Sequence, residues 1–274
     1  TLPPSRIETG AGDVISLPEE GGLGLYRIDR VERMAGAQKL EAVRIEPESY
    51  RPLTVETDGA RLRNLTAPGP VTAFFLDLPL LTGDETPHAP HIAVTSDPWF
   101  GPAAVHASDA DAGYRLNRIV AARTPIGVTQ NLLAGGRSGL IDRGGALAVR
   151  MLNGALSSVD DAALMNGANL CAIGDGEPGG WELFQFRDAV LSEPDTYLLS
   201  NRLRGQLGTE RAEEWPAGSY IVRLDGTPRQ IELAEAKRGQ ARHYRVGPAG
   251  RPFDDPGESH EVIDVDGVGL RPIS

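Results

Sequence analysis

The stretch from Asn169 to Glu210 reads NLCAIGDGEPGGWELFQFRDAVLSEPDTYLLSNRLRGQLGTE. Apolar and polar residues alternate over 181–186, which predicts a strand that pairs back onto 170–173 as a hairpin, with a loop over 175–180. A further strand is expected over 196–200. The stretch contains no nucleophile–base pair, no group of metal ligands and no phosphate-binding loop. We therefore interpret it as a structural β-unit.

A short helix is predicted immediately before this unit. Ser157 with Asp160, or Ser158 with Asp161, has the spacing of a capping box, and acidic residues are favourable at the positive end of a helix. A run of alanine, leucine and methionine continues the helix, and Gly167 is expected to end it.

The rest of the chain has the pattern of short strands joined by turns. The 33 glycines and 21 prolines are spread along the sequence, as expected for many turns. The fold class we predict is mainly β, with several small antiparallel β-domains, sandwich-like or barrel-like, and one or two short helices. A three-stranded meander is expected over 14–17, 25–31 and 40–45. Other strands are expected over 71–81, 92–95, 103–106, 114–122, 132–134, 146–150, 220–224, 242–246 and 262–265.

Domain boundaries follow from composition and turn signals. Ala67-Pro68-Gly69-Pro70 predicts a stiff, non-helical connector. We expect an N-terminal β-domain over 1–66, a β-rich middle region over 67–155 and a C-terminal β-domain over 156–274. The first residue is Thr1 rather than Met, so the chain is expected to begin within a longer polypeptide.

Charge and composition exclude several classes of protein. The formal net charge of −11 disfavours nucleic-acid binding, because a negative surface gains nothing from the release of counterions. No stretch approaches the ~20 apolar residues that a membrane-spanning helix needs. The single cysteine, Cys171, excludes an internal disulfide and a cysteine-based zinc site. Its apolar neighbours indicate a small buried hydrophobic side chain.

Two patterns resemble metal sites but are incomplete. His88 and His91 could share a metal on a helix, but Pro87 and Pro90 prevent that helix, so a pair of exposed loop histidines is expected. The run Asp109-x-Asp111-x-Gly113 begins like a calcium loop, but its twelfth position is Val120 instead of glutamate. An Asx-type turn is the expected structure, with weak calcium binding as a minor alternative.

The remaining patterns do not complete a catalytic site. The glycines between 174 and 180 precede no helix start and no Lys-Ser/Thr pair, which indicates a hairpin turn. Glu177 and Glu182 would need a defined separation across a cleft to act as a glycosidase pair. The tryptophans Trp99, Trp181 and Trp215 are expected to pack in the core or at corners. We predict no catalytic, cofactor-binding or metal-binding residue, and no enzyme activity.

The chain resembles the baseplate, tail-tip or host-specificity proteins of siphophage-like tails, and in particular the large multidomain tail-hub protein of alphaproteobacterial gene transfer agents. The matching motifs are Met165-Asn166-Gly167-Ala168-Asn169, Glu182-Leu183-Phe184-Gln185-Phe186, and the exit Leu199-Ser200-Asn201-Arg202-Leu203-Arg204-Gly205-Gln206-Leu207-Gly208-Thr209-Glu210. Arg202 departs from the pattern, because an apolar residue is usual there. The likeness is strongest over 156–256, and residues 12–44 also resemble the end of a hub-type β-domain.

This resemblance implies a structural part of the distal tail of a phage-like particle, assembled in the bacterial cytoplasm. The implied role is in attachment to the cell envelope and in DNA delivery. The implied partners are other copies of the chain in a homotrimer, other hub and baseplate proteins, and envelope polysaccharide. In the family a glycosidase-like barrel can precede this region, but it does not lie within this segment, so no catalytic residue is carried over.

Two alternatives stay open, a module that binds envelope polysaccharide and a domain associated with a glycoside hydrolase. For the structural role, we expect Arg204, Gly205, Gly208 and Thr209 to form the glycine-bounded turn that joins modules. We expect Arg204 to be a hydrogen-bonding anchor between modules, with a surface arginine as the alternative.

Overall fold

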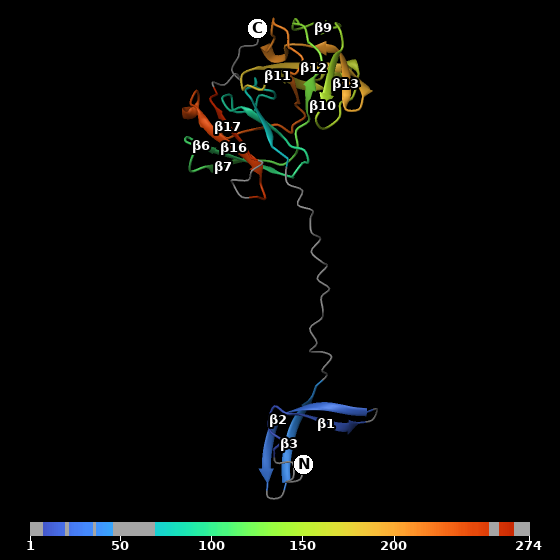
Figure 1. Cartoon of the computed structure of the whole chain (residues 1–274), viewed down its shortest axis with the longest axis vertical. Coiled ribbons are helices and arrows are strands. Elements are labelled where there is room, and N and C mark those ends of the chain that lie inside the picture. The colour runs from blue at the N-terminus through green and yellow to red at the C-terminus, as the bar shows by residue number, and fades with distance from the viewer. Residues whose placement is uncertain (1–7, 20–21, 35–36, 46–68, 252–257, 266–274) are drawn as a thin grey trace. The chain divides into compact units, whose positions relative to one another are not determined.

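The computed structural model describes residues 8–19, 22–34, 37–45, 69–251 and 258–265. The chain divides into two compact units, Thr1–Leu65 and Thr66–Ser274. Both units consist mainly of antiparallel strands, which confirms the predicted fold class (Figure 1). No helix among the described residues is long and apolar enough to cross a membrane.

The first unit contains a three-stranded antiparallel meander. Its strands are β1 (Val14–Glu19), β2 (Gly22–Met34) and β3 (Ala37–Arg44), paired in the order β1-β2-β3. The prediction of a meander is confirmed. Ile28 is the buried apolar side chain of this sheet, next to a register shift between Ile28 and Arg30. The predicted end of this domain at residue 66, and the first half of the connector after it, lie outside the described residues.

The second unit contains a closed barrel and two further sheets. The barrel strands follow the ring β10-β8-β14-β11-β12-β13, which a direct pairing of β13 with β10 closes, and β9 pairs with the last residues of β13 on the same side as β10. These strands are β8 (Ile126–Thr129), β9 (Ile141–Asp142), β10 (Leu147–Met151), β11 (Leu170–Gly174), β12 (Trp181–Glu193), β13 (Thr196–Leu203) and β14 (Tyr220–Arg223).

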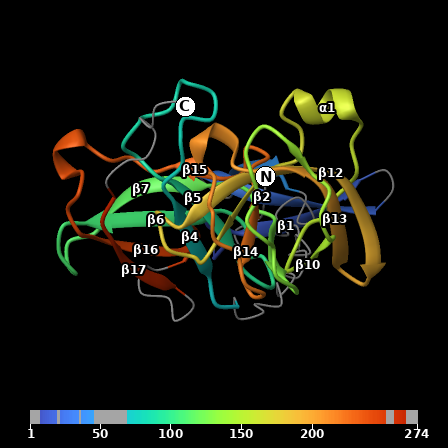
Figure 2. The same cartoon turned by 90° about the horizontal axis from the view of Figure 1, so that it is seen from above.

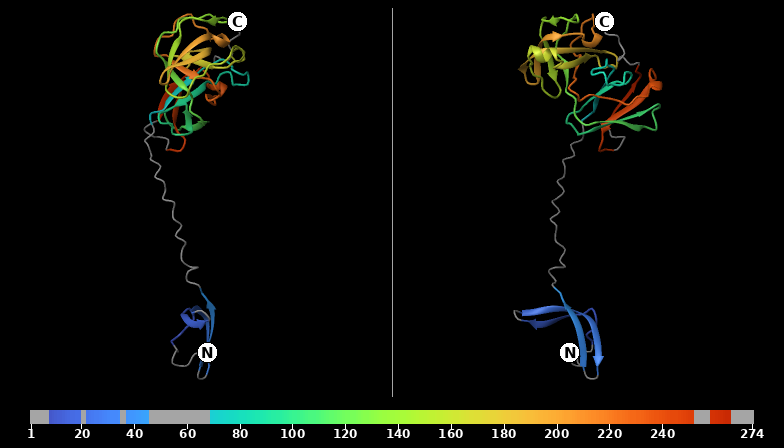
Figure 3. Two further views of the ribbon diagram at one scale, coloured as in Figure 1. Left: turned by 90° about the vertical axis from the view of Figure 1, so that its right-hand side faces the viewer. Right: turned by 180° about the vertical axis from the view of Figure 1, so that it is seen from behind.

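The other two sheets are built from the segments on either side of the barrel in sequence. One has the order β15-β5-β4 and the other the order β17-β16-β6-β7. Their strands are β4 (Thr72–Leu76), β5 (His91–Thr95), β6 (Ala103–Ser108), β7 (Arg115–Val120), β15 (Arg229–Gln230), β16 (Arg242–Pro248) and β17 (Ser259–Ile263). The barrel is therefore an insertion between two parts of a sandwich. Figure 2 shows β6, β7, β16 and β17 on one side of this unit and β12 and β13 on the other, and Figure 3 shows the same division from two further sides.

The small sheet of β4 and β5 is buried on both faces, because it lies between the four-stranded sheet and the barrel. Phe75 packs against Tyr244 of the four-stranded sheet, with ring centroids 4.8 Å apart. Phe74 points the other way, toward Trp181 and Tyr220 on the outside of the barrel. Burial on both faces explains why this segment is continuously apolar instead of alternating.

The strand predicted over 71–81 is too long. Pairing ends at Leu76, and the chain continues as a largely buried loop in which the Asp77 amide donates to the carbonyl oxygen of Pro178. Pro79 has no amide hydrogen for a ladder, which agrees with an early end to the strand. The strand predicted over 132–134 is reduced to a single bridge between Leu133 and Trp215.

The barrel has its own apolar interior. On β12, Phe184 and Phe186 point into this core together with Cys171, and Leu183 points outward against β4. Burial raises the pKa of the Cys171 thiol to about 12, which confirms the prediction of a buried hydrophobic cysteine. Strands from both sides of residue 155 close this barrel, so the boundary expected between 67–155 and 156–274 falls between strands of one sheet.

A short helix, α1 (Asp161–Met165), leads into β11, with 3₁₀ turns at η3 (Gln206–Gly208) and η4 (Glu235–Lys237) elsewhere in this unit. The helix was predicted, but its capping residue is Asp160 instead of a serine. The Asp160 carboxylate accepts the Ala163 amide at 2.7 Å. The Ser158 hydroxyl instead bonds the backbone of Ala189 on β12, which removes it from the helix end.

Replacing Asp160 by alanine should lower the free energy of unfolding by about 1 kcal/mol, because the Ala163 amide loses its capping acceptor. Urea unfolding followed by circular dichroism measures this change. Ser157→Ala is the matched control and should change stability by less than about 0.5 kcal/mol, because Ser157 is exposed. A larger effect of Ser157→Ala than of Asp160→Ala would contradict the assignment of the cap.

Candidate functional site

The turn after β13, residues 204–210, is the exit turn identified from the sequence. Its first two residues, Arg204 and Gly205, bind one buried carboxylate, that of Glu182. Its position on β12 puts it in phase with Phe184 and Phe186, so it points into the barrel. Its Oε1 accepts from Arg204 Nε at 2.8 Å and from the Gly205 amide at 3.1 Å. Its Oε2 accepts from Arg204 Nη2 at 2.9 Å and from the Trp215 indole at 2.8 Å. Four donors thus satisfy a carboxylate whose residue is 1 % exposed.

Arg204 is the partner of this carboxylate and is fully buried. Two of its nitrogens bind Glu182, and its Nη1 donates to the carbonyl oxygen of Ala134 at 2.8 Å. The expectation of an anchor between modules is wrong for the described residues, as is the alternative of a surface arginine. All of these contacts lie within the barrel unit. Glu182 is on the inward-facing side of β12, and Arg204 directly follows the last residue of β13, so the two side chains meet inside the barrel.

The residues after Arg204 hold the chain in a tight turn. Gly205 has φ of +59°, and a Cβ at this position would lie 2.4 Å from the Cβ of Glu210, so no larger residue fits. The Thr209 hydroxyl accepts the Leu183 amide and donates to the carbonyl oxygen of Gln206, both at 2.8 Å. The turn therefore returns to β12 next to Glu182, which fixes the exit from β13.

Arg202, which departs from the tail-protein motif, forms a second ion pair. Its Nε and Nη2 donate to Asp142 Oδ2 at 3.0 and 2.8 Å, and its Nη1 donates to the carbonyl oxygen of Leu199. Burial alone would raise the pKa of Asp142. The Gly144 amide and the Arg202 guanidinium act in the opposite direction, and the net pKa is lowered. The arginine is therefore accommodated by β9, which adds to β13 at this point.

These ion pairs stabilise the barrel, and the Glu182 carboxylate has no free acceptor position for a substrate. The lone pairs of Glu182 are occupied by four donors, and Glu177 lies exposed on the hairpin between β11 and β12. The two residues therefore do not face each other across a cleft. Glu182, Asp142 and Trp215 were not identified as partners of the exit turn from the sequence. For Glu182 there was one usable signal in the sequence: it alternates with Phe184 and Phe186, so all three side chains are expected on the same, inward face of the strand.

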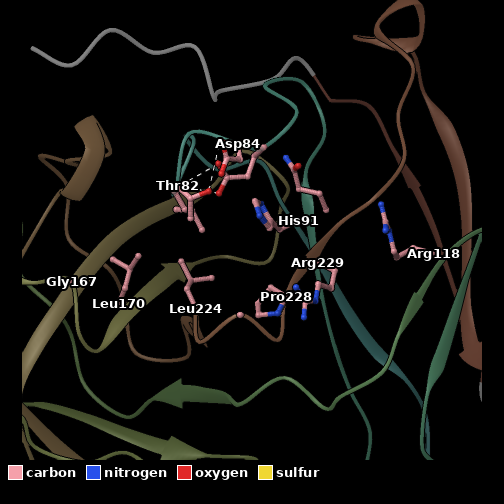
Figure 4. A pocket seen from close by; sticks show the side chains of 13 residues that line it. Thr82, Asp84, His91, Arg118, Gly167, Leu170, Leu224, Pro228 and Arg229 are labelled. Atoms are coloured by element: carbon pink, nitrogen blue, oxygen red, sulfur yellow. Dashed lines mark hydrogen bonds between the residues drawn. The ribbon is translucent and has the colours of Figure 1, made fainter.

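A pocket of about 550 Å³ opens between the barrel and the adjoining sheet (Figure 4). Leu170 and Leu224 form an apolar wall in Figure 4, and His91, Arg118 and Arg229 lie on the opposite side. Its lining includes no tryptophan, tyrosine or phenylalanine. The full set of lining residues also contains Leu81, Thr82, Asp84, Glu85, Gly167, Gly226, Pro228 and Gln230.

His91 is the buried titratable group of this pocket. The expectation of two exposed loop histidines is wrong, because His91 begins β5 and is 7 % exposed. His88 is half-buried, and its Nε2 lies 2.9 Å from the carbonyl oxygen of Leu233. Burial lowers the pKa of His91, and the charge of Glu85 acts in the opposite direction. Glu85 itself accepts the amides of Thr82 and Gly83, and these hydrogen bonds outweigh the effect of burial and lower its pKa.

The tryptophans pack internally, as predicted, although Trp99 is only half-buried. Trp181 donates its indole N–H to the carbonyl oxygen of Phe75 at 3.2 Å. Trp215 lies in the barrel core, with the Arg211 guanidinium 4.3 Å above its ring. Trp99 stacks on Phe100 with centroids 4.8 Å apart.

Replacing Arg204 by alanine should destabilise the protein by about 3–5 kcal/mol, because the charge of Glu182 would stay buried without its partner. Glu182→Gln should have an effect of similar size, because it leaves the guanidinium unpaired. Chemical denaturation of each variant measures the change.

Arg150→Ala is the control for the loss of an arginine from the same barrel, because Arg150 is exposed on β10. It should change stability by less than about 0.5 kcal/mol. If Arg204→Ala were as stable as Arg150→Ala, the buried ion pair would not contribute to the stability of the barrel.

Stability should fall between about pH 7 and pH 5.5 because of His91. The unfolded chain takes up a proton near the ordinary pKa of about 6.5, whereas the folded chain resists protonation because the pKa of His91 is lowered. The unfolded state therefore binds more protons in this window, and the stabilising effect is lost as the pH falls. His91→Gln should reduce the dependence in thermal unfolding without abolishing it, because burial also lowers the pKa of His106. Equal pH profiles for the wild type and His91→Gln would refute this account.

Comparison with known protein families gives one match. Residues 124–222 match the model described as "Rcc01698-like, C-terminal". This is a family of proteins associated with gene transfer agents in alphaproteobacteria. The match covers a little over a third of the chain, and it coincides with the barrel from the start of β8 to β14. No curated protein matches the chain. The inserted barrel, with its buried Glu182–Arg204 pair, is thus the part of the chain that is similar to proteins associated with gene transfer agents.

Proposed function

We propose that this chain is a non-enzymatic structural component of the tail baseplate or tail tip of a phage-like particle of the gene-transfer-agent type. In that place it forms part of the distal hub that attaches to the cell envelope and through which DNA is delivered. The observation that carries the proposal is the family match over 124–222, because it covers the complete barrel and the exit turn.

The physical character of the barrel supports a role in an assembly. A closed barrel has no free sheet edges within its ring, and the fully satisfied pair of Glu182 and Arg204 fixes its closure. A net charge of −11 suits a conduit that must not retain DNA. The proposed partners are further copies of this chain in a homotrimer and other hub and baseplate proteins.

The two alternatives receive no specific support. A polysaccharide-binding module commonly presents an exposed aromatic face, whereas Trp181 and Trp215 are buried and the pocket of Figure 4 has no large aromatic side chain. Trp99 is half-buried, and it packs against the sandwich core together with Phe100. A role next to a glycoside hydrolase has no observation in its favour among the described residues. We therefore develop neither of them.

The proposal is tested in the bacterium that encodes the chain. An epitope-tagged copy should co-sediment with nuclease-protected particles in a density gradient, and immunogold should label one end of the tail. A disruption of the gene should abolish DNA delivery, and the wild-type gene should restore it.

Matched variants connect this test to the barrel. Arg150→Ala should restore delivery as the wild type does, and Arg204→Ala should not, because its barrel is destabilised. The proposal is wrong if the tagged chain stays outside the particle fraction, or if particles that lack it deliver DNA normally.

A further inference from the structure

Three side chains with metal-binding groups meet on the outer face of the four-stranded sheet. His243 lies on β16 and His260 on β17, and Asp111 lies in the loop between β6 and β7. One nitrogen or oxygen atom from each residue lies within 4.8 Å of the others. This is the one such group found among the described residues.

The sheet register explains why the histidines meet. Arg245 pairs with His260, and His243 pairs with Val262, so the two imidazoles are diagonal neighbours on one face. Tyr244 lies between them in sequence and points into the core, which makes the histidine face the outer one. The two rings lie 5.7 Å apart between centroids, with an angle of 20° between their planes.

The carboxylate is positioned by its own contacts. Asp111 Oδ1 lies 3.6 Å from His260 Nε2 and accepts the Tyr114 hydroxyl at 2.6 Å. That hydroxyl and the Arg245 guanidinium hold the carboxylate in place beside His260. Asp109, two residues earlier, binds Lys237 and Arg242 and is therefore engaged elsewhere.

Two features favour a cation at this place. His243 Nδ1 is buried and has no hydrogen-bond partner among the described residues. Two ligands on one zinc ion, each about 2 Å from it, lie roughly 3–3.5 Å apart, so the separations of up to 4.8 Å between the ligand atoms need to shorten by up to about 1.5 Å. Arg245 Nη2 lies 3.3 Å from Asp111 and competes with a metal ion, but Glu258 is a second partner for Arg245, with its Oε1 3.9 Å from Nε.

We propose that Asp111, His243 and His260 form a binding site for a first-row divalent cation, with Zn²⁺ as the ion it suits best. Two neutral imidazoles and one carboxylate are the donor set that such ions prefer, whereas Ca²⁺ and Mg²⁺ prefer oxygen ligands alone. A bound ion would tie the loop that carries Asp111 to β16 and β17. The proposal is independent of the proposed tail function.

Calorimetric titration of the whole chain with Zn²⁺ at about pH 7.5 tests this site. The wild type should bind one ion per chain, and His260→Ala and Asp111→Asn should each weaken binding by roughly tenfold or more. Binding should weaken in acidic solution, because protonated imidazoles cannot coordinate. Ca²⁺ should produce no comparable heat.

Cobalt supplies a readout that surface binding would not give. Co²⁺ should produce a visible absorption band in the wild type that Zn²⁺ displaces and that His243→Ala lacks. His88→Ala is the matched control, because its Nε2 lies 2.9 Å from the carbonyl oxygen of Leu233 and outside the group. Circular dichroism confirms that each variant is folded. Equal Zn²⁺ affinity of the wild type and His260→Ala, or equal losses in His260→Ala and His88→Ala, would overturn the proposal.

Discussion

The buried pair of Glu182 and Arg204 is the constraint on which the barrel depends. Removing two charges from water is costly, and such a pair is tolerated only when every remaining donor and acceptor is satisfied. Here the carboxylate receives four donors, and the third nitrogen of the guanidinium reaches the carbonyl oxygen of Ala134. These contacts join β12, the exit of β13 and both sides of the bridge between Leu133 and Trp215. A barrel closed in another register would leave at least one of these groups unpaired, so the pair selects this closure.

Local patterns predicted much of the fold, because strand formation here follows the nearby sequence. The hairpin of β11 and β12 was predicted from alternation over 181–186 and the glycine-rich turn before it. The strand over 71–81 was predicted instead from a continuous apolar run bounded by turn signals, and it was too long. A segment buried on both faces is uniformly apolar, so alternation cannot show where its pairing ends. The helix cap was assigned to a serine, but the cap is Asp160. The Ser158 hydroxyl binds the backbone of Ala189 on β12, and this long-range contact is not visible in the local sequence.

The partners within the site could not be predicted in the same way, because they are set by long-range register. Arg204 was identified as important from a motif, but its partner depends on which residues of β12 face inward. The meeting of Asp111 with His243 and His260 depends on the pairing of β16 with both β6 and β17. Neither the calcium-like spacing around Asp111 nor the isolated histidines carry that information.

The strands that match a known family are contiguous in sequence and form the barrel, whereas the strands before and after them form the sandwich and lie outside the match. The family match covers 124–222, and the chain enters and leaves the barrel at adjacent points, where the Arg223 amide donates to the carbonyl oxygen of Pro125 at 3.0 Å. The sandwich on either side contributes His91 and Arg118 to the pocket and holds the whole Asp111 group. The proposed role among proteins associated with gene transfer agents therefore rests on the barrel. Properties particular to this chain are better sought in the sandwich, where titratable groups are less completely satisfied than in the barrel core.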